Sequence, residues 1–536
     1  MEPRPATSLR SGRLISRKEN PMTTRRPALL FSAAALAAAL GLTGCAVAAT
    51  SSGSDSTTAT VTQVVPDDLS AEAVLAANSD ATTVNDDEWS ASDAVDIAAS
   101  SDTVTISEAG VYRLSGEYTG GVVIDAGEDA LVVLILDGAD IAGDGGPGIQ
   151  VTSADDVGIY LADGTTNTVT DAGASYADDA DFHAAIASAA DLTISGAGSL
   201  EVTAVDDGIS TSDDLVILSG AIDVTSGDDG LRGHDSLVVK GGDITVDASG
   251  GDALKSDTDD DETKGWIEIA GGTLDLTTGD DGLDAATDIV VTGGEISISA
   301  ADDGMHSETI LVIEGGDVTV AGSEEGLESF TISLAGGTID VTSNDDGVNA
   351  SGGDSSGGGG MGGGMGDGGQ LISISGGEVV IDAQGDGLDS NGSLEMSGGT
   401  VTVYGPTGDG NGALDTNGSL TVSGGTLVAI GSSGMAESPD TDSAQSFVAA
   451  LASGSAGQLV QVVDADGEVI AEVTATKQFA SVVVSTPDVV GGASYTVLVD
   501  GQEAGTATSG EALAGDMGGG MGGGGMDGDD RGPSRG

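Results

Sequence analysis

Pairs of aspartates followed by glycine and an apolar residue recur about every 22 residues along this chain. Four copies are complete: Asp206-Asp207-Gly208-Ile209, Asp228-Asp229-Gly230-Leu231, Asp280-Asp281-Gly282-Leu283 and Asp302-Asp303-Gly304-Met305. Looser copies are Gly251-Asp252-Ala253-Leu254, Glu324-Glu325-Gly326-Leu327, Asp345-Asp346-Gly347-Val348, Gly385-Asp386-Gly387-Leu388 and Asn411-Gly412-Ala413-Leu414. A fixed period of this size is typical of a stacked solenoid, so one acidic position is repeated along one edge of the stack.

Carboxylates in such a column repel one another. Equivalent residues in adjacent turns of a stacked β structure lie about 4.8 Å apart. Two charges at that distance repel by about 0.9 kcal/mol in water and by about 3.5 kcal/mol at an effective dielectric constant of about 20. The column is therefore costly unless protons or cations reduce its charge. Ca²⁺ suits it, because this ion takes about six to eight oxygen ligands in flexible geometry.

We predict Ca²⁺ ligation by the aspartates of the motif and by a second acidic cluster within residues 257–264. For any single pair the alternative is that Asp-Gly simply makes a good turn, and for the whole set we expect at least one Ca²⁺ site. The predicted ligands are Asp206, Asp207, Asp228, Asp229, Asp252, Asp280, Asp281, Asp302 and Asp303, with Asp257, Asp259, Asp260 and Asp261 in the second cluster.

A second column follows the apolar residue of each motif. Its side chains should point outward along one face of the stack, where rows of polar groups can hold an extended polysaccharide. A solvated surface is the alternative. The members are Arg232, Lys255, Asp284, His306, Glu328, Asn349, Asp389 and Asp415.

An enzymatic alternative is a polyuronate lyase. That reaction needs Ca²⁺ on the substrate carboxylate and a Lys or Arg base that removes the adjacent proton. Lys255 is the best candidate and Arg232 the next. A Lys among carboxylates has a raised pKa, which is unfavourable for a base. We therefore expect a binding protein without enzymatic activity, and a purely structural or adhesive surface protein is the third alternative.

Short strands must position these columns. Alternating apolar residues precede each Gly-Gly pair, as Ile289 and Val291 do, and a second set follows it, as Ile296 and Ile298 do. The residue after the acidic motif, such as Met305, supplies a third apolar contact. Three short strands in about 22 residues predict an all-β, right-handed parallel β-helix. A propeller would need about 40 or more residues per repeat, and the RTX nonapeptide signature is absent.

The chain begins with features of a secreted lipoprotein. Arg25-Arg26, an apolar stretch and Leu42-Thr43-Gly44-Cys45 predict a signal peptide with lipidation of Cys45 and a start possible at Met22. We expect a lipid anchor on the outer side of the cytoplasmic membrane. The predicted segments are 1–44 (signal peptide), 45–88 (lipidated Cys and flexible linker), 89–435 (β-helix with a Gly/Met-rich insertion at 352–369), 440–510 (antiparallel β cap) and 511–536 (disordered Gly/Met tail).

Charge limits the partners. The chain has 88 acidic and 15 basic residues and a formal net charge of −73. Such a protein should not bind nucleic acid or an anionic membrane surface by charge, so the membrane contact should be the lipid alone. Its single cysteine rules out an internal disulfide framework. We expect a monomer whose partners are cations and polysaccharide.

Several segments together resemble the calcium-binding parallel β-helix carbohydrate-binding proteins, a bacterial family similar to pectate lyases in fold. The resemblance implies that pectic or cellulosic polysaccharide is bound, with Ca²⁺ in the fold. It adds Trp266, which stands where the family usually has tyrosine, to Arg232, Lys255, Asp284, His306 and Glu328 as carbohydrate-binding candidates. The strong negative charge implies that Ca²⁺ would have to bridge the chain to polygalacturonate. The matching segments are Glu108–Gly116, Leu161–Thr168, Ala190–Gly196, Asp229–Gly242, Leu254–Asp257 and Lys264–Ile267.

Overall fold

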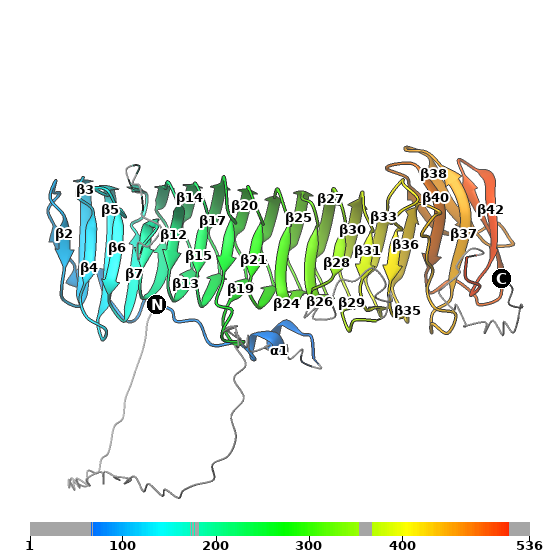
Figure 1. Ribbon diagram of the computed structural model, residues 1–536, viewed down its shortest axis with the longest axis horizontal. Helices are drawn as coiled ribbons and strands as arrows, with labels where there is room; N and C mark the ends of the chain where they lie inside the picture. The colour runs from blue at the N-terminus through cyan, green and yellow to red at the C-terminus, as the bar shows by residue number, and fades with distance from the viewer. Residues whose placement is uncertain are drawn as a thin grey trace, which may run out of the picture. The chain divides into compact units, whose positions relative to one another are not determined.

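The computed structural model describes Pro66 and residues 68–171, 173, 176, 182–352 and 367–513. These residues all belong to one compact unit and are almost entirely β. Besides strands, they form a short α-helix, α1 (Ala71–Leu75), and a 3-10 helix, η1 (Ala91–Asp93). The strands stack along one axis (Figure 1). The prediction of an all-β chain is confirmed.

The strands before the Gly-Gly corners form one parallel ladder, called ladder 1. Each strand pairs with the equivalent strand of the next turn, so Ile289 lies opposite Leu311 and Val291 opposite Ile313. Its strands are β1 (Val95–Ile97), β3 (Gly110–Tyr118), β5 (Leu131–Ala142), β7 (Asp156–Leu161), β10 (Asp191–Gly196), β13 (Asp214–Ile217), β16 (Ser236–Val239), β19 (Trp266–Ile269), β22 (Asp288–Val291), β24 (Met305–Ile313), β26 (Leu327–Leu334), β29 (Leu371–Ile374), β32 (Ser393–Met396) and β35 (Leu420–Val422).

The strands after these corners form ladder 2, which is also parallel. Ile296 lies opposite Val318, and Ile298 lies opposite Val320. The ladder starts from the end of β5 and continues through β8 (Thr166–Thr170), β11 (Ser199–Thr203), β14 (Ala221–Ser226), β17 (Asp243–Ala248), β20 (Thr273–Thr278), β23 (Glu295–Ser299), β25 (Asp317–Gly322), β27 (Thr338–Ser343), β30 (Glu378–Ala383), β33 (Thr400–Tyr404) and β36 (Thr426–Gly431).

Ladder 3 carries the acidic motifs at its strand starts. Leu283 lies opposite Met305, and Asp284 opposite His306, so the repeat register expected from the sequence is present. Its strands are β2 (Val104–Ile106), β4 (Val122–Asp125), β6 (Ile149–Ser153), β9 (Ala184–Ser188), β12 (Asp207–Thr211), β15 (Leu231–Gly233), β18 (Leu254–Ser256), β21 (Leu283–Ala285), the first halves of β24 and β26, β28 (Val348–Ala350), β31 (Leu388–Ser390) and β34 (Leu414–Thr416).

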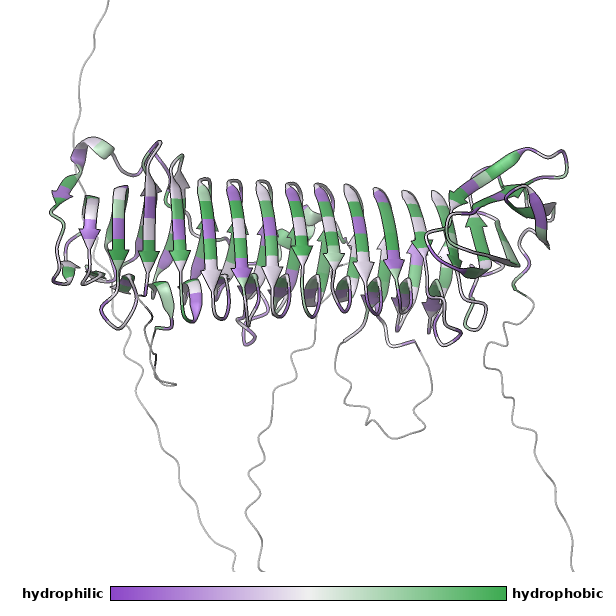
Figure 2. Ribbon diagram, turned by 90° about the horizontal axis from the view of Figure 1, so that it is seen from above, coloured by the Kyte–Doolittle hydropathy of each residue, from purple (hydrophilic) through white to green (hydrophobic). Residues whose placement is uncertain are grey.

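The core is one continuous apolar column enclosed by the three ladders. Ile289, Ile296 and Met305, taken from one turn, are each at most 1% exposed and belong to the same buried cluster. Along the strands of ladder 2, buried and exposed residues alternate, and Figure 2 shows the resulting bands of hydrophobic and hydrophilic residues. Period-two patterning therefore packs like residue on like in every turn.

Glycine serves two separate purposes in each turn. The second glycine of a Gly-Gly corner, such as Gly316, has φ of 88°, which side chains disfavour. The glycine of the acidic motif has no positive φ. At Gly304 a Cβ atom would instead collide with the carbonyl oxygen of Gly326 in the next turn and with Val320. The motif glycine is needed because adjacent turns approach closely there.

Residues 68–84, called the N-terminal strap below, lie on the outer face of ladder 1. Ala71 and Val74 are buried against a cluster of β22 and β24 residues, and the amide of Val84 donates to Thr193 Oγ1 at 2.9 Å. The expectation of a flexible linker is wrong for this part of 45–88. The segment has no periodicity of its own, because its apolar residues fit the ladder rather than one another. Cys45 and the predicted signal peptide lie outside the described residues.

The C-terminal segment changes to antiparallel pairing. β40 (Phe479–Ser485) pairs antiparallel with β36 and with β37 (Phe447–Gly454). A separate four-stranded antiparallel sheet holds β39 (Val469–Thr474), β38 (Leu459–Val463), β41 (Ser494–Val499) and β42 (Gln502–Thr508). Most of 352–369 and of 511–536 lies outside the described residues. Among those described, no helix has the length and apolar character needed to cross a bilayer.

Candidate polysaccharide-binding and cation-binding face

The second acid of each motif links its own turn to the next. The backbone amide of Asp252 donates to Asp229 Oδ1 at 2.9 Å, the amide of Asp281 to Asp252 Oδ1 at 2.9 Å, and the amide of Asp303 to Asp281 Oδ1 at 2.7 Å. The amide of Glu325 continues the series to Asp303 Oδ1 at 3.2 Å. These carboxylates therefore brace the stack, a role that neither the turn nor the calcium interpretation of the sequence included.

Burial makes these carboxyls hard to ionise. Asp207, Asp229 and Asp303 are 6–8% exposed. Burial raises the pKa of Asp207 to about 6 and that of Asp229 to about 7, and neighbouring carboxylates add to both shifts. At Asp303, burial and a hydrogen bond with Glu328 raise the pKa to about 9. Burial is therefore the main obstacle to ionisation along the column, and repulsion between neighbouring carboxylates adds to it.

The first aspartates of the motifs are more exposed to solvent than the second ones. In two groups, the carboxylates of first and second aspartates lie close together. Carboxylate oxygens of Asp206, Asp207 and Asp228 lie within 4.8 Å of one another, as do those of Asp252, Asp280 and Asp281. These all-oxygen donor sets fit Ca²⁺, whose coordination is flexible. Asp302, the remaining predicted ligand of the motif, is exposed.

The second predicted cluster has other partners. Asp257 accepts hydrogen bonds from Arg232 Nε at 3.0 Å and Nη2 at 2.6 Å, and its Oδ1 lies 2.6 Å from His234 Nδ1. Asp261 accepts from the amide and hydroxyl of Thr263 at 3.1 and 2.9 Å. Asp259 and Asp260 are exposed. These contacts tie Asp257 to Arg232 and His234, and Asp261 to its own loop.

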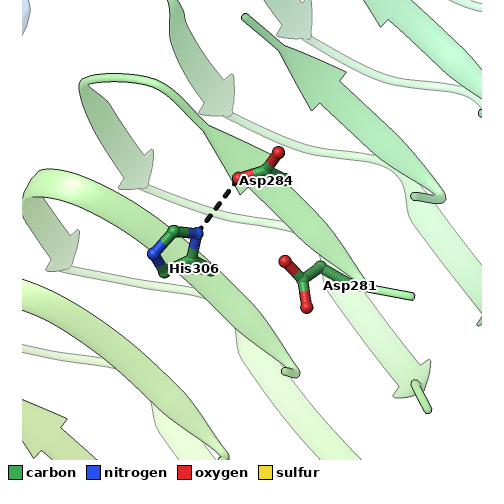
Figure 3. A group of neighbouring side chains, drawn as sticks. All are labelled: Asp281, Asp284 and His306. Atoms are coloured by element: carbon green, nitrogen blue, oxygen red, sulfur yellow. Dashed lines mark hydrogen bonds and ion pairs between the residues drawn. The ribbon is translucent and has the colours of Figure 1, made fainter. Parts of the chain in front are cut away.

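From Lys255 to Glu328, basic and acidic side chains alternate along the outward column of ladder 3. The Nζ atom of Lys255 hydrogen-bonds Asp252 and lies 3.3 Å from Asp284 Oδ2. His306 Nδ1 lies 3.1 Å from the other oxygen of Asp284 (Figure 3). Burial alone would lower the pKa of Lys255, but Asp252, Asp229 and Asp284 raise it. The raised pKa agrees with the expectation that Lys255 is a poor base.

His306 and Asp284 are held in their charged forms by each other. The hydrogen bond to Asp284 raises the pKa of His306 to about 9, against the opposing effect of burial. Burial would raise the pKa of Asp284, yet His306 and Lys255 together keep it below its ordinary value. Glu328, the next residue of the column, lies close to Asp303 and Glu325, with their carboxylate oxygens within 4.8 Å.

A pocket of about 370 Å³ opens over this face between β12 and β21. It contains two cationic side chains, and every other charged group that lines it is acidic or a histidine. The lining residues are His183, Asp206, Asp207, Asp228, Asp229, Arg232, Gly251, Asp252, Lys255, Asp257 and Asp280. The pocket therefore brings together seven of the predicted metal ligands and two of the predicted carbohydrate contacts.

The family model of a carbohydrate-binding domain-containing protein matches residues 100–369 and 303–477. The chain belongs to this family. A carbohydrate-binding domain-containing protein from Acetivibrio thermocellus is 38% identical over 126 residues, which are 23% of this chain and 44% of the relative. The chain therefore spans less than half the length of this curated relative. A polysaccharide lyase-like protein from C. thermocellum, solved as a gadolinium derivative, is 31% identical; the match covers 41% of this chain and 94% of that one, with a TM-score of 0.39.

In this carbohydrate-binding domain Trp266 is not an exposed platform. It lies on ladder 1 rather than ladder 3, is 4% exposed, and packs with Val216 and Val238 beneath Leu75 and Ala81 of the strap. The expectation that it contacts a sugar is wrong for this structure. Position in the sequence gave no indication that the strap packs over the indole, together with Leu218 of the body.

Sequence reasoning also missed three groups of site residues. His183 reaches Asp206 Oδ2 at 2.8 Å. Glu325 joins Asp303 and Glu328, and its place in a looser motif copy was the signal for it. A further carboxylate set, Asp191, Asp213 and Asp214, lies on ladder 1 and at its turn, where the acidic motif does not extend.

Proposed function

We propose that the protein binds acidic polysaccharide on the outward face of ladder 3, with Ca²⁺ held by the motif aspartates. The supporting observation is the pocket that places Arg232 and Lys255 among the carboxylates of four successive motifs. We further propose that the three ladders form a right-handed parallel β-helix. Membership of the carbohydrate-binding domain family supports a glycan as the partner.

The chemistry of the pocket suits a uronate chain rather than a neutral one. Arg232 carries a permanent positive charge that attracts a carboxylate, and 30% of its side chain remains exposed although Nε and Nη2 are bound to Asp257. Ca²⁺ would supply the positive charge that allows two anions to meet. Asp206, Asp228 and Asp280, the more accessible first acids, would share its coordination with substrate carboxylates.

We propose binding without cleavage. A lyase base must lose its proton near the working pH, and the carboxylates around Lys255 stabilise its charged form. Arg232 is bound to Asp257 through two nitrogens. Pectic chains are the proposed ligand and cellulosic chains the alternative, on a monomeric lipoprotein at the cell surface that is anchored through Cys45.

Calorimetric titration tests the proposal. Residues 46–536 would be freed of metal with a chelator and titrated with Ca²⁺, then with polygalacturonate and with a soluble β-glucan. Heat from polygalacturonate only when Ca²⁺ is present would support the proposal. Accumulation of ultraviolet-absorbing unsaturated uronates would make the protein a lyase. Tight Ca²⁺ binding with no heat from either glycan would favour a metal-stabilised surface scaffold.

A further inference from the structure

The strap covers an apolar trough on the outer face of ladder 1. Ala71 and Val74 pack on Val290, Ile310 and Val312. Leu75 and Ala81 pack on a second apolar group that consists of Val216, Val238 and Trp266. The strap therefore crosses several turns of ladder 1, outside the enclosed core and away from the polar face of ladder 3.

Three carboxylates on the body accept hydrogen bonds from the strap, in addition to the contacts of Ser79 with Thr263 and of Val84 with Thr193. The amide of Ala71 donates to Glu314 Oε1 at 2.9 Å, Asn78 Nδ2 donates to Asp288 Oδ2 at 3.0 Å, and the amide of Thr82 donates to Asp214 Oδ2 at 2.8 Å. Glu314 is exposed, whereas Asp214 and Asp288 are buried. The charge state of buried acids thus bears directly on how firmly the strap is held.

Asp288 is the least satisfied of the three. It is 6% exposed, and its Oδ1 atom is buried without a hydrogen bond of normal geometry. Trp266 Nε1, on the neighbouring strand of the ladder, is buried without a partner as well. By contrast, Asp214 Oδ1 accepts a hydrogen bond from Ser236 Oγ at 2.7 Å. A charged Asp288 under the strap would be desolvated with little compensation, which is costly.

We propose that the N-terminal strap is a pH-governed latch, which stays docked over Trp266 while Asp288 is neutral and loosens when Asp288 ionises. Leaving the trough returns Asp288 to water, where its charge is solvated. Release would expose Trp266 and free the strap from the body. Nothing in the ladder 3 face has to move.

The groups around Asp288 determine which of its protonation states the docked strap favours. Burial raises the pKa of Asp288 to about 6, opposed by Asn78 and the amide of Ile310. The charged residues on the elements packed around it are Asp68, Glu72 and Asp80 of the strap, Glu268 of β19, Glu308 and His306 of β24, and Lys264 just before β19. Of the two cations among them, Lys264 is bound to Asp235, and His306, on the ladder 3 half of β24, is bound to Asp284. None of these side chains offers Asp288 a counter-charge.

The sign of the effect follows from the two states. The docked strap gives Asp288 a raised pKa of about 6, and the undocked strap leaves an ordinary carboxyl pKa of about 4. Protons therefore favour docking. The stabilisation of the docked strap by protonation of Asp288 is complete below about pH 4, declines as pH rises, and is lost above about pH 6. The ratio of open to docked strap should rise on the order of 100-fold across that window.

Trp266 itself reports the latch. The chain has two tryptophans, and Trp89 packs edge-on against Tyr160 at 5.1 Å, so Trp89→Phe keeps an aromatic ring there. In the full chain with this change, acrylamide quenching of Trp266 would be followed from about pH 5 to about pH 8, above the isoelectric point of about 4.1. We expect quenching to increase with pH and to level off above about pH 6.

Matched variants identify the group responsible. Adding Asp288→Asn should keep Trp266 protected at every pH, whereas Asp275→Asn, at an exposed acid of ladder 2, should leave the pH response unchanged. Asn78→Ala should raise quenching at every pH without changing Asp288. If Asp288→Asn perturbs folding, amide exchange of residues 71–84 in the Trp89→Phe chain, corrected for intrinsic rates, gives the same readout. Protection that does not vary with pH, or an Asp288→Asn variant that responds like its parent, would overturn the latch.

Discussion

Replacement of Asp229 by asparagine should stabilise the metal-free protein at neutral pH. Asp229 is 7% exposed, and burial raises its pKa to about 7 from 3.8. Because its folded-state pKa is the higher one, ionisation costs stability as pH rises from about 4 through about 7. The shift sets a ceiling of roughly 4 kcal/mol on that cost at pH 8. Asparagine keeps the acceptor for the amide of Asp252 but loses the attraction of Lys255, 3.9 Å away, so we expect a gain of about 1–3 kcal/mol.

Urea denaturation followed by circular dichroism, in chelator at about pH 5 and about pH 8, measures this difference. The advantage of Asp229→Asn should grow with pH. Saturating Ca²⁺ should reduce or reverse it, because the variant lacks a proposed ligand. Asp229→Ala removes the acceptor too and should be destabilising by about 1–3 kcal/mol, while Asp228→Asn at the exposed neighbour should change little. An Asp229→Asn protein that is less stable than its parent in chelator at pH 8, or a difference that does not vary with pH, would refute the reasoning.

Four further outcomes follow from the structure. Gly304→Ala should cost several kcal/mol in urea denaturation, because the added methyl group would collide with Gly326 and Val320; a neutral effect would show that the turns can separate. Trp266→Ala should cost about 3–5 kcal/mol, as for other buried tryptophans, and should leave glycan affinity unchanged in calorimetry. Arg232→Gln should weaken Ca²⁺-dependent polygalacturonate binding by about tenfold while sparing Ca²⁺ binding, and equal affinity would place the ligand elsewhere. Chelation of Ca²⁺ should lower the thermal midpoint at pH 8 more than at pH 5, since the motif carboxyls then carry more charge.

Repetition made the central part of the fold predictable from sequence. The same side-chain types return at each ladder position. The alternation seen at Ile296 and Ile298 therefore predicts a strand in every turn, and the glycine seen at Gly294 predicts a corner in every turn. The register of the column from Arg232 to Asp415 was predicted correctly because strand geometry fixes which face a residue occupies, although one member, Asn349, is buried. The prediction that the protein lacks enzymatic activity and the assignment of Ca²⁺ remain predictions.

Single, unrepeated contacts could not be predicted in the same way. The strap belongs to no repeat, and its burial depends on residues more than 200 positions away, as the hydrogen bond between Asn78 and Asp288 shows. Trp266 was misassigned for this reason. The inter-turn role of Asp229 was missed because sequence spacing shows that two residues are near, but not which oxygen meets which amide.

The place where the strap begins determines how the protein carries mechanical load. The chain enters at Ala71 beside Glu314 and β24, in the middle of the stack, and only reaches the first turn after crossing ladder 1. A pull on the chain preceding Asp68 would therefore act first on the contacts of α1 and then on those of Asn78 and Thr82, one after another. Peeling of this kind needs much less force than shearing all the contacts at once. The strap would lengthen under tension before any turn of the ladders was strained, so it would be the first of the described segments to detach under load.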